Sequence, residues 1–391
     1  AGRAGASVRL IEMHGQLGGI WTTGLLCWIL DASDKPGVMA DILRRLRAHE
    51  GAQPHLINGV GYHPEAMKLV LEQMCMEAGI RVRLHTRLAG VHRAGRRIEA
   101  VVTESKSGRE AFAGKVFIDA TGDGDLAAFA GCAFEVGRAD DDPSGAPGET
   151  QPMTLMAMLG GADERAMHDA GLLRGPDVSP KQSKQAIRKA LAAHGVQTSY
   201  GDPTLFPVGH GMLGLMTHPP YGRSAFDVDD LTAATIEGRQ EVHRVVEALR
   251  RCGGPLGKLQ LIATAAQIGV REGRRVVGLY RVTADDAIEG RTHADAVCRL
   301  NSGFDVRAPR PSTGKGAGRQ AHPAKPFDIP FRALVARDVE NLLLAGRCVS
   351  GDFLAHSSYR VTGNAVALGE AAGRAAATAA TTGRALPEAW K

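Results

Sequence analysis

Residues 341–373 read NLLLAGRCVSGDFLAHSSYRVTGNAVALGEAAG. The short apolar run at 341–345 predicts a buried strand, which ends in the triplet Ala-Gly-Arg. From residue 360 to about 380 the sequence is rich in alanine and glycine, and it predicts one long helix that can pack closely. The free N–H groups at the start of such a helix attract electron-rich ligand atoms. Small residues also occur where helices pack for structural reasons alone, so this stretch needs support from elsewhere in the chain.

A second strand-and-turn pattern lies at residues 115–125, KVFIDATGDGD. The run at 115–120 predicts another buried strand, and it passes directly into Thr121 and Gly122. Small residues at the end of a strand allow the backbone to approach a ligand closely. Asp123 is predicted to cap a helix that begins near Leu126.

The beginning of the chain carries a third pattern. Residues 7–12, SVRLIE, predict a strand that ends in Glu12. In a dinucleotide-binding fold an acid at this place binds a ribose hydroxyl; otherwise it is a solvated carboxylate at a strand end. The Gly-rich loop of that fold is absent, and residues 1–5 (AGRAG) resemble the tail of the helix that follows it. The chain is therefore predicted to be N-terminally truncated, without a first strand and GxGxxG loop of roughly 20–25 residues.

The remaining pattern suggests three segments. Residues 1–150 alternate strands with a helix at 64–79, which favours a parallel sheet. Residues 151–335 form a different unit, and residues 336–391 return to the first. The second unit is predicted to contain strands at 153–159 and 259–268, helices at 180–194 and 229–251, and an exposed Gly- and Pro-rich loop at 303–330.

Composition excludes several classes of protein. Glycine is 49 of 391 residues, well above the usual ~7%, but the charged and hydrophobic fractions are those of a globular protein. The net charge of +5 is scattered and aromatic residues are only 5%, which argues against nucleic acid. Six cysteines without a CxxC pair suggest neither a metal site nor a disulfide framework. The sequence shows no membrane span and no signal peptide, so a cytoplasmic location is expected.

Taken together, these stretches resemble the FAD-dependent oxidoreductases among the glutathione-reductase-like flavoproteins, which are distantly related to the flavoprotein subunits of fumarate reductase and succinate dehydrogenase. The resemblance covers nearly the whole chain, and IGVREGRRVVGLY and HPEAMKLVLEQMCMEAG also carry it. It implies an α/β fold, with a Rossmann-like FAD-binding domain and an inserted α+β substrate domain.

The same resemblance implies which residues lie along FAD. From the adenosine end to the flavin they are Glu12 at the ribose, Leu88 at the adenine, Gly18, Gly19 and Thr22 along the pyrophosphate and flavin, Ala120, Thr121 and Gly122 near the diphosphate, Gly346 and Arg347 at the ribityl chain, and Gly363, Asn364 and Ala365 at the pyrimidine edge.

Candidate residues for the reaction are few. His356 and Arg360 come first because they directly precede the helix that is expected to face the flavin. Arg271 comes second, as a group that could hold a substrate carboxylate or could instead pair with an acid such as Glu272. His210 is a weaker candidate, since most histidines of an enzyme are surface or packing residues.

The leading hypothesis is an FAD-dependent oxidoreductase that moves a hydride between flavin and a small organic substrate, with anionic compounds included, and an unidentified electron acceptor. One alternative is a truncated, non-catalytic relic that binds no cofactor. Another is a nicotinamide-dependent dehydrogenase, because Glu12 suits NAD equally well.

Overall fold

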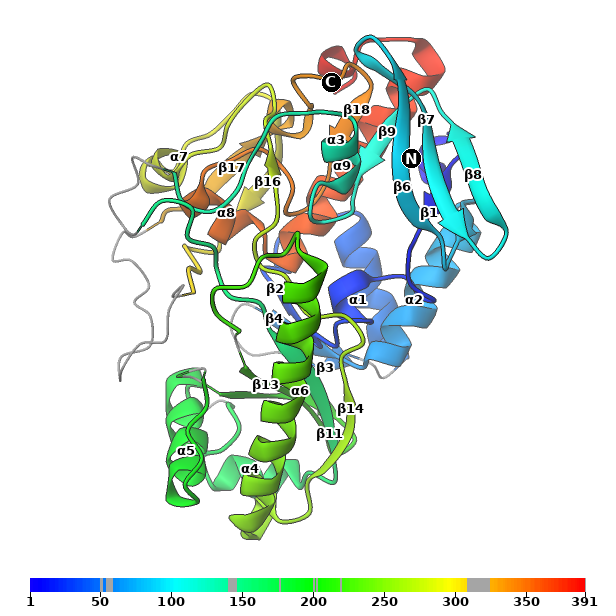
Figure 1. Ribbon diagram of the computed structural model, residues 1–391. Helices are drawn as coiled ribbons and strands as arrows, with labels where there is room; N and C mark the ends of the chain where they lie inside the picture. The colour runs from blue at the N-terminus through cyan, green and yellow to red at the C-terminus, as the bar shows by residue number, and fades with distance from the viewer. Residues whose placement is uncertain are drawn as a thin grey trace.

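The predicted strands near residues 7–12, 115–120 and 341–345 belong to two pairs of parallel strands (Figure 1). In the computed structural model, β1 (Arg9–Ile11) pairs with β5 (Arg81–Arg83), and β9 (Phe117–Asp119) pairs with β18 (Leu342–Leu344). The strands predicted at 7–12, 115–120 and 341–345 are confirmed, with shorter bounds. The structure describes residues 1–49, 52–53, 59–139, 146–175, 177–199, 201, 203–218, 220–307 and 324–390.

The two helices expected beside these strands are present. Helix α2 (Pro64–Glu77) begins as predicted, with proline in its first turn and the His63 ring accepting a hydrogen bond from the Glu65 N–H. The long C-terminal helix α9 spans Thr362–Thr382, which confirms the helix predicted from residue 360 to about 380 to within two residues at each end. A separate short helix, α8 (Phe353–Tyr359), comes first, and the chain turns between the two.

Antiparallel sheets surround the parallel pairs. Both of the smaller sheets have three strands: β6 (Arg87–Ala94), β7 (Arg97–Ser105) and β8 (Gly108–Ala113) in one, and β2 (Trp28–Leu30), β4 (Gly59–Tyr62) and β3 (Ala52–Gln53) in the other.

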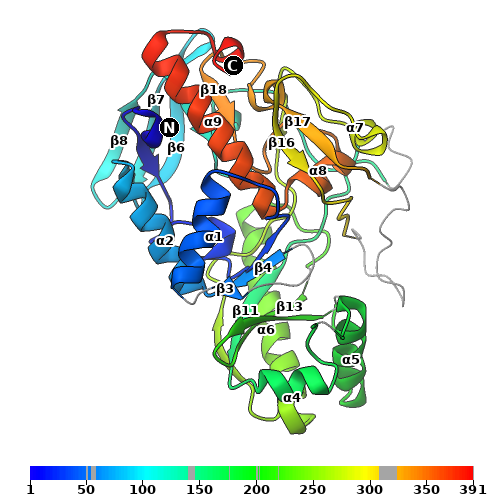
Figure 2. The ribbon, with the colours of Figure 1, turned by 180° about the vertical axis from the view of Figure 1, so that it is seen from behind.

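A four-stranded antiparallel sheet and its helices form the opposite end of the molecule (Figures 1 and 2). Its strand order is β12 (Thr204–Gly209), β13 (Met212–His218), β11 (Leu155–Gly160) and β14 (Gln260–Thr264). The strand expected at 259–268 is therefore shorter than predicted. The helices of this end are α4 (Glu164–Asp169), α5 (Pro180–Ala193) and α6 (Val228–Arg251), and the predictions of α5 and α6 are confirmed.

Shorter elements complete the described chain. They are the helices α1 (Val38–Ala48), α3 (Asp125–Phe129) and α7 (Ala284–Glu289), the strands β10 (Phe134–Glu135), β15 (Arg275–Val276), β16 (Ala296–Leu300) and β17 (Phe327–Pro330), and the 3-10 turns Gly2–Ala4, Gly19–Trp21, Gly254–Leu256, Phe331–Leu334 and Leu386–Glu388.

Two sequence predictions fail in these elements. The segment 303–330 was expected to be an exposed loop, but its last four residues form β17, which is buried at every position and pairs with β16. Residues 308–323 of that prediction lie outside the described residues. Asp123 does not cap α3: Gly124 is the N-cap residue, and the Ala127 N–H donates instead to the buried carboxylate of Asp119.

The largest core cluster joins the parallel pair β9–β18 to α9 and to β16–β17. Asn341, only 2% exposed, fastens this core to the sheet of β7. Its side chain accepts from the Ile98 N–H at 2.9 Å and donates to the Ile98 and Lys115 carbonyls at 2.8 and 3.1 Å. The buried amide of Asn341 therefore provides hydrogen-bond partners for three backbone groups, as a neighbouring strand would do.

Asp41, in the first turn of α1, accepts hydrogen bonds from three arginines. Partial burial opposes ionisation of Asp41, but hydrogen bonds from Arg3, Arg45 and Arg44 prevail and lower its pKa to about 2. Two of these contacts measure 2.6 Å (Arg3 Nη2) and 3.1 Å (Arg45 Nε). Because the folded pKa lies below the unfolded value, ionised Asp41 stabilises the fold above about pH 4, and this contribution is lost as the pH falls toward 2.

We therefore expect Asp41→Asn to lower the free energy of unfolding by about 1–2 kcal/mol at pH 7. The difference from the wild type should shrink as the pH is lowered from 5 toward 3, in urea unfolding followed by circular dichroism. Glu65→Gln is the matched control, because its ion pair with Lys68 is exposed and worth little. A pH-independent difference would contradict the ionic explanation.

Candidate functional site

Two of the four predicted reaction residues, Arg360 and Arg271, contact the segment that starts with Gln151. Arg360 Nη2 donates to Gln151 Oε1 at 3.2 Å, and Arg271 Nη1 donates to the Met153 carbonyl at 3.0 Å. His356 lies one helical turn before Arg360 and receives the N–H of that residue at its carbonyl. His210 is not part of this group: it is exposed in the hairpin turn between β12 and β13, with a φ of 54°.

His356 is a buried ring whose neighbouring arginines, Arg275, Arg347 and Arg360, each have an acidic partner. It is fully buried, and neither ring nitrogen forms a hydrogen bond of ordinary geometry with the described residues. Burial, followed by the charges of Arg275, Arg360 and Arg347, lowers its pKa well below the usual value, although the nearby Arg347 backbone opposes the shift. The ring is therefore uncharged at neutral pH, so it is poorly suited to begin a reaction as a proton donor.

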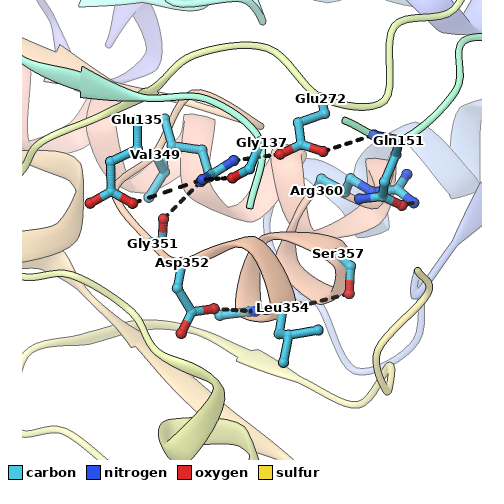
Figure 3. A network of polar contacts seen from close by, with 12 residues as sticks. Glu135, Gly137, Gln151, Glu272, Val349, Gly351, Asp352, Leu354, Ser357 and Arg360 are labelled. Carbon is cyan, nitrogen blue, oxygen red and sulfur yellow. Dashed lines mark hydrogen bonds and ion pairs between the residues drawn. The ribbon is translucent and has the colours of Figure 1, made fainter. Parts of the chain in front are cut away.

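A buried ion pair links the Gln151 segment to the loop before α8 (Figure 3). Arg275 Nη1 lies 2.6 Å from Glu272 Oε1, and the side chains are 1% and 0% exposed. Arg275 also donates to the carbonyls of Gly351 at 3.0 Å and Gly137 at 2.7 Å. The other Glu272 oxygen accepts the Gln151 N–H at 3.0 Å. Glu272 therefore pairs with Arg275, and this network orients the Gln151 segment.

Burial raises the pKa of Glu272, while the charge of Arg275 opposes that shift. Sequence reasoning did not select Gln151, Glu272 or Arg275 as site residues. For Glu272 and Arg275 the only sequence signal is the run of charged residues at 271–275, which is equally typical of a solvated surface, and Gln151 has none.

The start of α9 has no side-chain cap. Among the described residues no side chain forms a capping hydrogen bond to this helix, and its first turn contains no acid. Thr362 Oγ1 and Arg347 Nε are both buried without a hydrogen-bond partner among the described residues. Gly346 has a φ of 86°, and a Cβ there would find only the Cβ of Ala365, at 3.9 Å. Two unsatisfied donors beside an uncapped helix start and an open glycine fit the pyrimidine end of a flavin.

Three other residues expected near FAD, which are Arg347, Gly122 and Asn364, lie close to the start of α9 or to the end of β9. Arg347 Nη2 pairs with Asp123 Oδ1 at 2.7 Å, and its guanidinium lies so close to Gly122 that a Cβ there would collide with it. Asn364 is fully buried, and its amide donates to the Ser358 carbonyl at 3.4 Å. Its side chain therefore points into the protein, and its backbone N–H donates to the Val361 carbonyl at 3.1 Å.

Glu12, predicted at the ribose, and Gly19 and Thr22, predicted along the pyrophosphate and flavin, lie on successive turns after β1. Glu12 follows β1 directly, and its Oε1 accepts the His14 N–H at 2.8 Å. The Thr22 hydroxyl donates to the Leu17 carbonyl at 2.6 Å. Gly19 has a φ of 51° with open space around it, so a phosphate could approach its backbone.

Three further predicted positions are also described. Ala120 and Thr121 are exposed at the end of β9, where Thr121 Oγ1 donates to Asp119 Oδ1 at 2.7 Å. Leu88 lies on β6, opposite Thr103. Gly18 has a φ of 108° and packs against Thr22. The described residues thus fit a dinucleotide at both ends, and their individual roles stay predictions.

The class of protein follows from a comparison with protein families. The chain matches the family described as "FAD dependent oxidoreductase" over residues 1–388. It belongs to that family, and its cofactor is FAD. No curated protein matches the chain.

The solved structures to which this chain is similar include the following three. The myxobacterial chondrochloren halogenase CndH is 12% identical, with 99% of this chain and 72% of that chain covered and a TM-score of 0.49. A geranylgeranyl bacteriochlorophyll reductase-like protein from Thermoplasma acidophilum is 12% identical (98% and 74% covered, TM-score 0.47). BexE is 14% identical (97% and 58% covered, TM-score 0.46). The chain spans 50%, 58% and 62% of the length of three such structures.

Within the described ranges, none of the helices combines the length and the apolar character that a membrane crossing requires.

Proposed function

We propose that this chain catalyses hydride transfer between FAD and a small organic substrate at the start of α9. The observation that carries the proposal is the uncapped N-terminus of α9, with the buried and unpartnered donors Thr362 Oγ1 and Arg347 Nε beside it. FAD supplies the hydride chemistry when it is bound, and the chain supplies binding, orientation and charge. A helix N-terminus favours negative charge on a group placed against it.

The residues that would hold FAD are those of the two turns and of the α9 start. Glu12 would bind the ribose through the carboxylate oxygen that does not accept from His14. The backbones of Gly19, Gly346 and Gly363 would lie against the dinucleotide. The division into a cofactor unit at 1–150 and 336–391 and a substrate unit at 151–335 is part of this proposal.

The reaction residues would act from the Gln151 side. His356, uncharged at neutral pH, would accept a hydrogen bond or a proton from the substrate. Arg271 would position the segment at 152–153 through its contacts with the carbonyls of those residues. The exposed hairpin residue His210 has no part in this arrangement.

The test is whether the protein retains flavin and whether a donor can reduce it. We expect absorbance at roughly 450 nm in the purified protein, bleached anaerobically by its substrate. His356→Ala should retain flavin but be reduced by the substrate at least ~10-fold more slowly, if the ring moves a proton. Wild-type rates in this variant would remove His356 from the chemistry. A folded protein that binds no added FAD would support the non-catalytic alternative.

A further inference from the structure

We propose that Arg174 binds the carboxylate of an apolar organic acid, at a site that does not depend on the proposed hydride transfer. The residue lies between α4 and α5. Its guanidinium carbon Cζ is 3.5 Å from the centroid of the Trp28 ring and 5.3 Å from that of the Phe206 ring. Trp28 belongs to β2 and Phe206 to β12, so the site lies where the sheet that contains β4 meets the four-stranded sheet (Figure 2).

Two N–H groups of this guanidinium are not used by the described chain. Arg174 Nε and Nη2 are buried, and neither forms a hydrogen bond with a described residue. The two nitrogens form one edge of the guanidinium, and their N–H bonds point in nearly the same direction. A buried donor without a partner is costly, and here both donors of one edge are without one. This edge is therefore the part of Arg174 that a ligand would satisfy.

The charge of Arg174 also has no acidic partner among the described residues. Burial lowers its pKa to about 10, and the only neighbouring group that opposes the shift is the Cys27 thiol. Burial raises the pKa of Cys27 to about 12, so this thiol is uncharged at neutral pH while the guanidinium stays positive. By contrast, the buried Arg275 pairs with Glu272 at 2.6 Å. An anion bound at Arg174 would supply the missing negative charge.

The surroundings of the guanidinium favour an acid with an apolar body. The Trp28 and Phe206 rings are 5.8 Å apart, and both belong to a buried cluster that includes Met156, Met158 and Met216. Aromatic and methionine side chains adapt to apolar groups of different shape. The two parallel N–H groups match the two oxygens of a carboxylate, whereas a phosphate brings further oxygens for which this edge has no donors. The ligand class is therefore an aromatic or aliphatic carboxylic acid.

A purely structural role of Arg174 predicts a different result. A guanidinium that only clamps Trp28 through a cation–π contact would stabilise the protein without any ligand. A guanidinium that binds a ligand instead leaves an unpaired buried charge in the free protein, which methionine removes while filling similar space. Arg174→Met should therefore leave the thermal unfolding midpoint of the acid-free protein unchanged or raise it.

The experiment measures binding of small acids to the whole FAD-loaded protein. The probes are benzoate, phenylacetate and hexanoate, with benzamide, acetate, phenyl phosphate and inorganic phosphate as comparisons. Binding is followed by the thermal unfolding midpoint and by tryptophan fluorescence, because Trp28 contacts the guanidinium. At least one apolar acid should raise the midpoint and change the emission, at concentrations at which the comparison compounds do neither.

Matched variants assign the binding to this site. Arg174→Met should weaken binding of the acid by on the order of tenfold or more, because the bidentate contact is lost. Arg174→Lys, which also serves where the methionine variant fails to fold, should retain only part of the affinity. Trp28→Phe should lose the fluorescence response and still be stabilised by the acid. Arg165→Met removes an exposed cation from α4 and should change neither readout.

The proposal is overturned if no apolar acid binds to the wild type, or if Arg174→Met and Arg174→Lys bind acids as tightly as the wild type does. A lower midpoint of acid-free Arg174→Met, with acid binding unchanged, would assign the residue to packing alone. Phenyl phosphate that binds as tightly as benzoate would overturn the selection of a carboxylate. Flavin content and photoreduction, measured on the same samples without acid, test the proposed function separately.

Discussion

Replacing Arg275 with methionine is expected to lower the free energy of unfolding by about 3–5 kcal/mol. Glu272 is completely buried, and its ion pair with Arg275 measures 2.6 Å. Without the guanidinium, a carboxylate would remain in a site of low polarity with only the Gln151 N–H opposite one oxygen. The carbonyls of Gly351 and Gly137 would lose their donors as well. Urea unfolding at neutral pH, followed by fluorescence and circular dichroism, measures this loss.

Two controls separate the buried charge from a simple packing defect. The double variant Arg275→Met with Glu272→Met removes both charges, and we expect it to recover a large part of the lost stability. Arg281→Met removes a cation that pairs with Glu135 at the surface, and it should cost no more than about 1 kcal/mol. A double variant no more stable than Arg275→Met would contradict the role assigned to the ion pair.

Gly363→Ala is expected to displace the start of α9 and to destabilise the protein by about 1–3 kcal/mol or more. A Cβ at this position would lie 2.3 Å from the Asp31 carbonyl oxygen and 2.5 Å from that of Leu30. Both obstacles are backbone atoms, so no side-chain rotation relieves the collision. Because the predicted flavin-facing backbone begins here, the variant should also retain less FAD after gel filtration.

Gly369→Ala, two turns further along the same helix, is the matched control. A Cβ at Gly369 would meet no atom within 4 Å. Alanine is favoured over glycine inside a helix, so this variant should be more stable by roughly 0.5–1 kcal/mol. Equal behaviour of the two variants in thermal unfolding would show that the carbonyl contacts at Gly363 do not determine the packing of α9.

Much of the cofactor-binding half could be predicted from local patterns. The strand endings at Glu12, Thr121 and Gly346 are readable because a buried strand followed by small residues is a local signal. Asp123 shows where this reasoning fails. Its spacing fits a helix cap, but the Arg347 guanidinium lies 2.7 Å away and takes the carboxylate instead. Residue spacing alone does not show whether the Asp123 carboxylate caps the nearby helix or pairs with an arginine that is distant in the sequence.

Only part of the candidate reaction site could be predicted from the sequence. His356 and Arg360 could be selected because they precede α9 in the chain. The protonation state of His356 could not, since it depends on burial and on Arg275 and Arg347, which come from other segments. Gln151 carries no local pattern at all, because one glutamine acquires a role only through the partners that the fold brings to it.

The sequence by itself identified the family of this protein: the apolar strands, the small residues at their ends and the Ala- and Gly-rich helix within 341–373 carry the resemblance to FAD-dependent oxidoreductases, and the family match agrees with it. Only the tertiary structure decided which charges meet. It buried the pair of Arg275 and Glu272, made His356 neutral, and left two donors of Arg174 without a partner among the described residues. The physical reason is that periodicity and turn chemistry act over a few residues, whereas burial and Coulomb interactions depend on distances between segments far apart in the chain.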